Sequence, residues 1–133
     1  MTESARHANS VKRIKILLKE LGAEIRENSD SRGIGGYQLP GIWNDEECLF
    51  MQFTLDVFAI LKTGVPIAIE IDYHYKGTPR AAAKMHVRDF WLEKFGIKTV
   101  RLTPLMVDDM TAKQLQDEID WKLGLKKVEV ITP

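Results

Sequence analysis

Two apolar segments of the chain carry acidic residues where a buried strand normally has none. The first segment, residues 54–61, contains Asp56, and the second, residues 67–74, contains Glu70 and Asp72. A short turn with Gly and Pro separates them, so we predict that they pair as a hairpin. An acid within a strand that is buried on both faces is costly unless it is ion-paired or bound to a metal.

The spacing of residues within the second segment places its two acids on the same face of the strand. Its three isoleucines occupy every second position, so they point to one face of the strand while Glu70 and Asp72 share the other. Pairing of the two segments would bring Asp56 beside Glu70. Carboxylates clustered on one sheet face suit a hard divalent cation. The alternative is an acidic strand face that lies in solvent.

Length and cysteine content set the broad class. The 133 residues fit one domain, and we expect residues 1–9 to be flexible and residues 10–133 to form that domain. The single cysteine, Cys48, cannot form an internal disulfide. Neither a secretory signal nor an apolar run long enough to span a bilayer is visible. These features favour a cytoplasmic protein that makes no contact with membranes.

The charge is balanced overall but uneven along the chain. Basic and acidic residues number 19 each, and a net charge of zero argues against bulk electrostatic attraction to nucleic acid. Residues 1–20 and 60–104 lean basic, whereas residues 21–59 lean acidic. A basic face can therefore lie beside an acidic site.

Helical and strand-like patterns alternate along the chain. Ser10 is the expected cap of the first helix, and Pro79 and Thr111 open the other two. The apolar positions expected to face the core from the last two helices are Ala83, Val87, Phe90, Trp91, Phe95, Leu115, Ile119, Trp121 and Leu123. The expected strands cover residues 37–39, 49–53, 54–61, 67–74, 98–102 and 128–131. This order predicts an α/β domain with a central sheet and helices packed on it.

The element order and the acids together resemble the PD-(D/E)XK nuclease superfamily. In that superfamily an acid opens the second core strand and an acid-x-lysine follows on the third, and here Asp56 and Glu70 match the two acids. The very-short-patch-repair-like group is the nearest in appearance, through residues 70–72, 88–93 and 100–102. The resemblance covers about residues 8–123 and implies the restriction-endonuclease-like fold, a mixed central sheet flanked by helices in the order α-β-β-β-α-β-α.

The chain departs from the superfamily pattern at two positions. The usual lysine position holds Asp72, and His74, Lys76 and Lys84 are candidates to replace the lysine. Many members also place a glutamate on the first helix, whereas the inward positions expected here are apolar and Glu20 lies near the helix end. A protein that has lost activity therefore remains an open alternative.

The resemblance implies a metal-dependent DNA endonuclease. Mg2+, or Mn2+ in its place, would be held by Asp56 and Glu70 and by the backbone carbonyl of Ile71, with Asp72 as a third ligand or a neighbouring acid. Such a cation polarises the phosphate and lowers the pKa of a bound water. Lys76 or His74 would orient the water or stabilise charge on the phosphate. The catalytic candidates are thus Asp56, Glu70, Asp72, His74 and Lys76.

A basic stripe provides candidates for DNA binding. Arg80, Lys84 and Arg88 recur every fourth residue, so they lie along one side of the second helix and could follow a phosphate backbone. Lys12 and Arg13 on the first helix form a second basic face. The alternative for both is a solvated helix surface.

Three interpretations of function follow. The first is a DNA endonuclease, with a Holliday-junction resolvase and a repair or nicking nuclease as versions of it. The second is a catalytically inactive nucleic-acid-binding module on the same fold. The third is a subunit of a larger complex. A homodimer is compatible with each of them.

Overall fold

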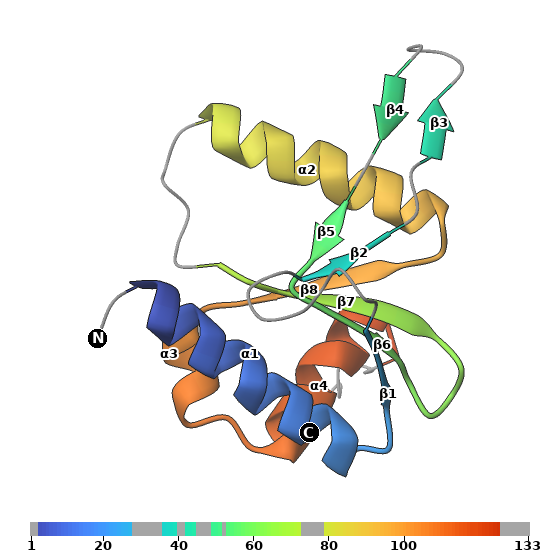
Figure 1. Ribbon diagram of the computed structural model, residues 1–133. Helices are drawn as coiled ribbons and strands as arrows, with labels where there is room; N and C mark the ends of the chain where they lie inside the picture. The colour runs from blue at the N-terminus through green and yellow to red at the C-terminus, as the bar shows by residue number, and fades with distance from the viewer. Residues whose placement is uncertain are drawn as a thin grey trace, which may run out of the picture.

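A four-stranded sheet forms the centre of the computed structural model, which describes residues 3–27, 36–39, 42–44, 49–51, 53–72 and 79–125. The strand order is β1-β6-β7-β8 (Figure 1). β1 and β7 both run antiparallel to β6, and β8 runs parallel to β7. The strands are β1 (Glu24–Arg26), β6 (Val57–Ile60), β7 (Pro66–Ile71) and β8 (Lys98–Leu102).

Four short strands lie beside this sheet. They form two antiparallel pairs, β2 with β5 and β3 with β4, and Figure 1 shows β3 and β4 projecting furthest from the main sheet. Their bounds are β2 (Tyr37–Gln38), β3 (Ile42–Asn44), β4 (Leu49–Met51) and β5 (Thr54–Leu55). The strand expected at residues 128–131 lies outside the described residues.

Helices cover both faces of the sheet. Figure 1 shows α2 on one face and α1, α3 and α4 on the other. Their bounds are α1 (Glu3–Glu20), α2 (Pro79–Lys94), α3 (Pro104–Asp108) and α4 (Ala112–Leu123). The observed architecture is the predicted mixed α/β arrangement. Within the described part of the chain, no helix is both long and apolar enough to cross a membrane.

The alternation predicted for β7 is confirmed. Ile67, Ile69 and Ile71 join the core that packs against α1, α3 and α4. Ala68 belongs to the smaller core on the other face, together with Leu92 of α2. Both faces of β7 are covered, which explains why its sequence is nearly continuous in apolar residues. Glu70 follows the parity of Ala68 and therefore lies on the α2 face.

The predicted hairpin also forms, with one local difference. Val57 of β6 pairs with Ile69 of β7, and the turn between the strands places Gly64 at φ 91°, a left-handed conformation that favours glycine. Asp56 does not lie within a continuous strand as expected. It occupies a bend between β5 and β6 and so stands at the end of β6, next to Glu70 in the neighbouring strand.

Two helix starts differ from the prediction. α1 begins at Glu3, and Ser10, the expected cap, lies inside the helix with 4 % of its surface exposed. Residues 3–9 are rich in helix-forming Glu, Ala and Arg and extend the helix by two turns. Pro104 opens α3, a helix that was not among the expected elements, after Thr103, whose hydroxyl caps it. Thr111 begins α4 as expected, and it forms a capping box with Gln114.

The side of α2 that faces the sheet was predicted wrongly. Leu92 is fully buried, and Arg88, one turn earlier, also turns toward the sheet. The acidic sheet face attracts the arginine, so the aromatic side of the helix points outward. The expected core residues that are exposed are Ala83, Val87, Phe90, Phe95 and, on α4, Trp121.

Replacing Leu92 tests the observed orientation of α2. Leu92→Ala should lower the free energy of unfolding by about 2–5 kcal/mol, because it opens a cavity between α2 and the sheet. Val87→Ala on the exposed side should change it by about 0.5 kcal/mol or less. Urea unfolding monitored by circular dichroism measures both. A larger loss for Val87→Ala than for Leu92→Ala would contradict this orientation.

Candidate functional site

Asp56 and Glu70 lie side by side at the open end of the β6–β7 hairpin, opposite its turn. The Asp56 N–H donates to Glu70 Oε2 (3.4 Å), and the Ile71 N–H donates to Asp56 Oδ2 (2.8 Å). Each acid thus accepts a hydrogen bond from the backbone of the opposite strand. The sequence correctly predicted that these two acids lie side by side.

Glu70 is the buried member of the pair, with 5 % of its surface exposed. Its partner is Arg88 of α2, whose Nη2 lies 2.7 Å from Glu70 Oε1. The same Nη2 also donates to the carbonyl oxygen of Thr54 on β5. Arg88 therefore ties α2 to both β5 and β7.

The surroundings of Glu70 favour its neutral form. Burial and, second, the nearby Asp56 carboxylate raise the pKa of Glu70 to about 8, and the Arg88 guanidinium acts in the opposite direction. A carboxyl group with such a pKa is poised to exchange its proton for another cation near neutral pH.

His7 is a member of the site that the sequence analysis missed. Its Nε2 lies 3.2 Å from Asp56 Oδ2, so α1 reaches the acid pair from the face opposite α2. Residues 1–9 were expected to be flexible, and no helical position was assigned to His7. The signal was present, because His7, Ser10 and Ile14 follow the i, i+3, i+7 spacing of the buried side of α1.

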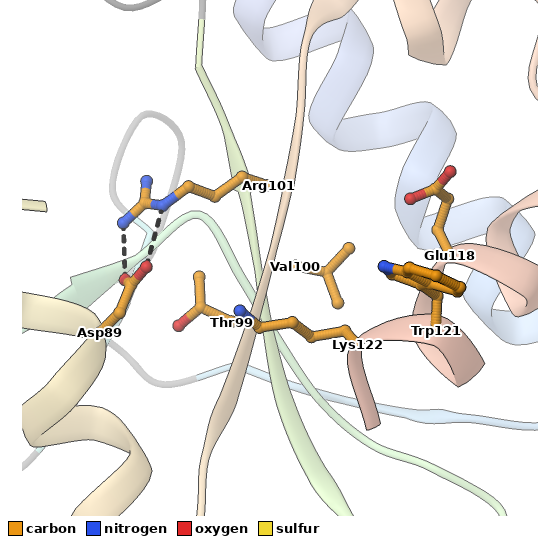
Figure 2. A pocket seen from close by; sticks show the side chains of 7 residues that line it. All are labelled: Asp89, Thr99, Val100, Arg101, Glu118, Trp121 and Lys122. Atoms are coloured by element: carbon orange, nitrogen blue, oxygen red, sulfur yellow. Dashed lines mark hydrogen bonds and ion pairs between the residues drawn. The ribbon is translucent and has the colours of Figure 1, made fainter. Parts of the chain in front are cut away.

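Asp72 belongs to a separate ion network on the same sheet face. Arg101 of β8 donates through Nη1 to Asp72 Oδ2 (2.7 Å) and through Nε and Nη2 to the two oxygens of Asp89 on α2 (3.2 and 2.7 Å). Figure 2 shows the fork that joins Arg101 to Asp89. Burial alone would lower the pKa of Arg101, but the bonds to Asp89 and Asp72 outweigh it and raise the pKa above its usual value.

A cavity of about 180 Å³ adjoins this network along β8. Figure 2 shows Arg101 and Thr99 on one side of β8, and Trp121 and Glu118 of α4 on the other. Neither Asp56 nor Glu70 lines it. The acid pair and this cavity are therefore separate features of the surface.

The two predicted basic surfaces are only partly free to meet DNA. Arg80 and Lys84 are exposed on α2, whereas Arg88 turns inward to Glu70. Lys12 is exposed on α1. The Arg13 side chain donates to the carbonyls of Val107 and Met110 (2.9 and 2.7 Å) and so anchors α1 to the end of α3.

The side chains of the site can be compared with the ligands that a divalent cation requires. His74 and Lys76 lie outside the described residues. Within the parts of the chain that the structure describes, no group of three His, Cys, Asp or Glu side chains is arranged to hold a metal ion. Asp56 and Glu70 supply two carboxylates. Mg2+ retains several waters when it binds proteins, so two carboxylates fit its requirements.

Comparison with known proteins adds no relative to this picture. The sequence matches no protein-family model, and no similar chain was found among curated proteins or among solved structures. The function is therefore inferred from the side chains themselves.

The high pKa of Glu70 predicts a pH-dependent stability in metal-free buffer. The usual pKa of 4.5 applies in the unfolded chain and about 8 in the folded one, so between these values the folded state binds more protons. The free energy of unfolding should fall as pH rises through this window, by up to about 1.4 kcal/mol per pH unit. Glu70→Gln should flatten this slope.

Urea unfolding at several pH values with EDTA measures this dependence. Glu118→Gln, at an exposed position on α4, is the matched control and should keep the wild-type slope. If Glu70→Gln and wild type have the same slope, Glu70 is not the titrating group.

Proposed function

We propose that the protein is a metal-dependent nuclease that hydrolyses phosphodiester bonds of DNA. The observation that carries this proposal is the pair of Asp56 and Glu70, two carboxylates from adjoining strands that meet at the end of the hairpin. One of them is buried with a raised pKa, and two closely spaced carboxylates of this kind suit Mg2+ or Mn2+.

The arrangement of elements supports a restriction-endonuclease-like fold for this function. α1, the acid-bearing hairpin, α2 and the parallel strand β8 follow one another in the order that the superfamily resemblance implies. The positions of the two acids, Asp56 directly before β6 and Glu70 on β7, support this assignment.

Each described residue of the site has a definable part in hydrolysis. When bound, the divalent cation polarises the phosphate and lowers the pKa of a water ligand. Asp56 and Glu70 would hold the cation, together with the backbone carbonyl of Ile71. His7 and the Ile71 N–H fix the orientation of the Asp56 carboxylate. Lys76 or His74 would supply the group that stabilises charge on the phosphate.

Arg80 and Lys84 are the proposed contacts to DNA. Both are exposed on the helix that covers the acid pair, and their spacing of four residues places them on one side of it. Lys12 extends the basic surface on α1. The substrates to compare are nicked DNA and branched DNA such as a Holliday junction. The protein acts on them as a homodimer or as a monomer.

A second candidate function is a nucleic-acid-binding module without catalysis. One observation favours it: Asp72 occupies the position of the usual lysine and is held by Arg101 together with Asp89. A carboxylate at this position cannot supply the positive charge that a lysine gives to a phosphate. If the protein is a nuclease, Lys76 or His74 must supply this positive charge, whereas an inactive module needs neither residue.

A cleavage assay separates the two candidates. Purified protein is incubated with duplex, single-stranded, nicked and branched DNA in Mg2+ and in Mn2+. Wild type should cut at least one form, and Asp56→Asn should cut none, because it removes a carboxylate from the cation. Lys76→Ala should lower kcat by about 100-fold or more with little change in DNA affinity.

Thermal unfolding checks the metal site independently of cleavage. Millimolar Mg2+ should stabilise wild type by about 1–3 kcal/mol and leave Asp56→Asn unchanged. Metal-induced stabilisation without cleavage of any DNA would favour the inactive module. If metal does not stabilise the wild type and the wild type cuts no DNA, the nuclease proposal is refuted.

The salt dependence of DNA binding tests the basic surface of α2. The Arg80→Gln/Lys84→Gln variant should lower the slope of log K against log salt by about 0.9 for each phosphate of duplex DNA that it no longer neutralises. The control, Lys113→Gln/Lys122→Gln, removes the same charge from exposed positions of α4. Equal slopes for the two variants would reduce Arg80 and Lys84 to solvated surface.

A further inference from the structure

Two arginines pair with carboxylates on the α2 face, and their bonding differs. Arg101 uses Nε, Nη1 and Nη2 to bind Asp72 and Asp89. Among the described residues, Arg88 bonds to Glu70 and to the Thr54 carbonyl, in both cases through Nη2. Its Nε is buried and has no hydrogen-bond partner among the described residues. Arg101 is thus a structural link that bonds through three nitrogens, whereas the described bonds of Arg88 all use one nitrogen.

We propose that Arg88 is an exchangeable partner of Glu70: it binds the Glu70 carboxyl group in the metal-free protein, and a divalent cation displaces it so that its guanidinium binds a DNA phosphate. This inference rests on the proposed function and names the regulation of that same site. Metal would bind first and prepare the arginine for DNA.

Electrostatic repulsion at the acid pair favours such an exchange. Arg88 Nη2 lies 2.7 Å from Glu70 Oε1, and Glu70 Oε2 faces Asp56, so a divalent cation held by the two acids would lie close to the positive charge of Arg88. Two positive groups on one carboxylate in a site of low polarity repel each other strongly. Glu70 has 6 % of its side chain exposed and cannot turn to solvent, so the arginine, with 32 % exposed, is the group that moves.

The position of Arg88 on α2 determines where it would go. Arg80 and Lys84 precede it by two turns and one turn on the same side of the helix, and both are exposed. A released Arg88 would extend this row of cations at the end nearest the acid pair. Its planar fork suits a phosphate, to which it can donate two parallel hydrogen bonds.

Removing Arg88 should therefore tighten metal binding. The loss of its charge favours both a proton and a metal ion on Glu70, but a divalent ion feels twice the repulsion that a proton feels. The net effect is a gain in metal affinity. We expect Arg88→Gln to lower the Kd for Mg2+ by about tenfold or more, the range of a hydrogen bond to a charged group.

Isothermal titration calorimetry with MgCl2 measures this effect without any cleavage. Arg80→Gln removes the same charge from an exposed position of α2 and should keep the wild-type Kd. Arg88→Lys retains the charge and should also stay close to wild type. An Arg88→Gln variant that folds and binds Mg2+ no more tightly than wild type would overturn the proposal. A wild type that binds no Mg2+ would instead refute the proposed function.

Nuclear magnetic resonance provides a second measurement, on the wild type. The Nε–H signal of Arg88, identified by its loss in Arg88→Lys, should shift on addition of MgCl2, while that of Arg101 should not. If the Arg88 signal stays fixed while Mg2+ binds, Arg88 does not exchange partners. This result does not depend on whether Arg88→Gln folds.

The coupling to DNA can be measured with Ca2+ and a fluorescent duplex. By reciprocal linkage, metal should strengthen DNA binding partly through the released Arg88. The ratio of the Kd for DNA in EDTA to the Kd for DNA in Ca2+ should be lower in Arg88→Gln than in wild type, by a factor of about five or more. Arg80→Gln should weaken binding in both buffers and keep the ratio. An unchanged ratio in Arg88→Gln would mean that Arg88 does not pass to the DNA.

Discussion

The burial of one carboxylate, Glu70, is the constraint on which the α2 half of the structure depends. A carboxyl group in the middle of a covered sheet is tolerated only with a hydrogen-bond partner, and Arg88 is that partner. The requirement places Arg88 toward the sheet and turns the aromatic side of α2 outward. An electrostatic demand thus sets the rotation of a helix whose sequence suggests a different buried face.

The acid pair is also a local organiser of the backbone. Asp56 and Glu70 each accept a hydrogen bond from the strand of the other, which closes the hairpin at the point where regular pairing ends. His7 then connects the pair to α1 on the far face of the sheet. Groups from both helical layers therefore converge on the two carboxylates, Arg88 of α2 on Glu70 and His7 of α1 on Asp56.

The two arginines of this face illustrate how structure and chemistry can share one surface. Arg101 satisfies two acids with three nitrogen atoms and acts as a fixed link between β8 and α2. Within the described part of the chain, Arg88 bonds through one nitrogen, next to the acid with the raised pKa. A stable network beside a weakly satisfied one is consistent with a scaffold that holds an adaptable site.

The sequence by itself determined the mixed α/β class, the hairpin, the alternation along β7 and the meeting of Asp56 with Glu70, because these follow from spacing between near neighbours. Only the tertiary structure decided which side of α2 is buried, that His7 reaches Asp56, and that Arg101 meets Asp72. Those contacts join residues far apart in the chain. They depend on how helices rotate to satisfy buried charges, which local periodicity does not encode.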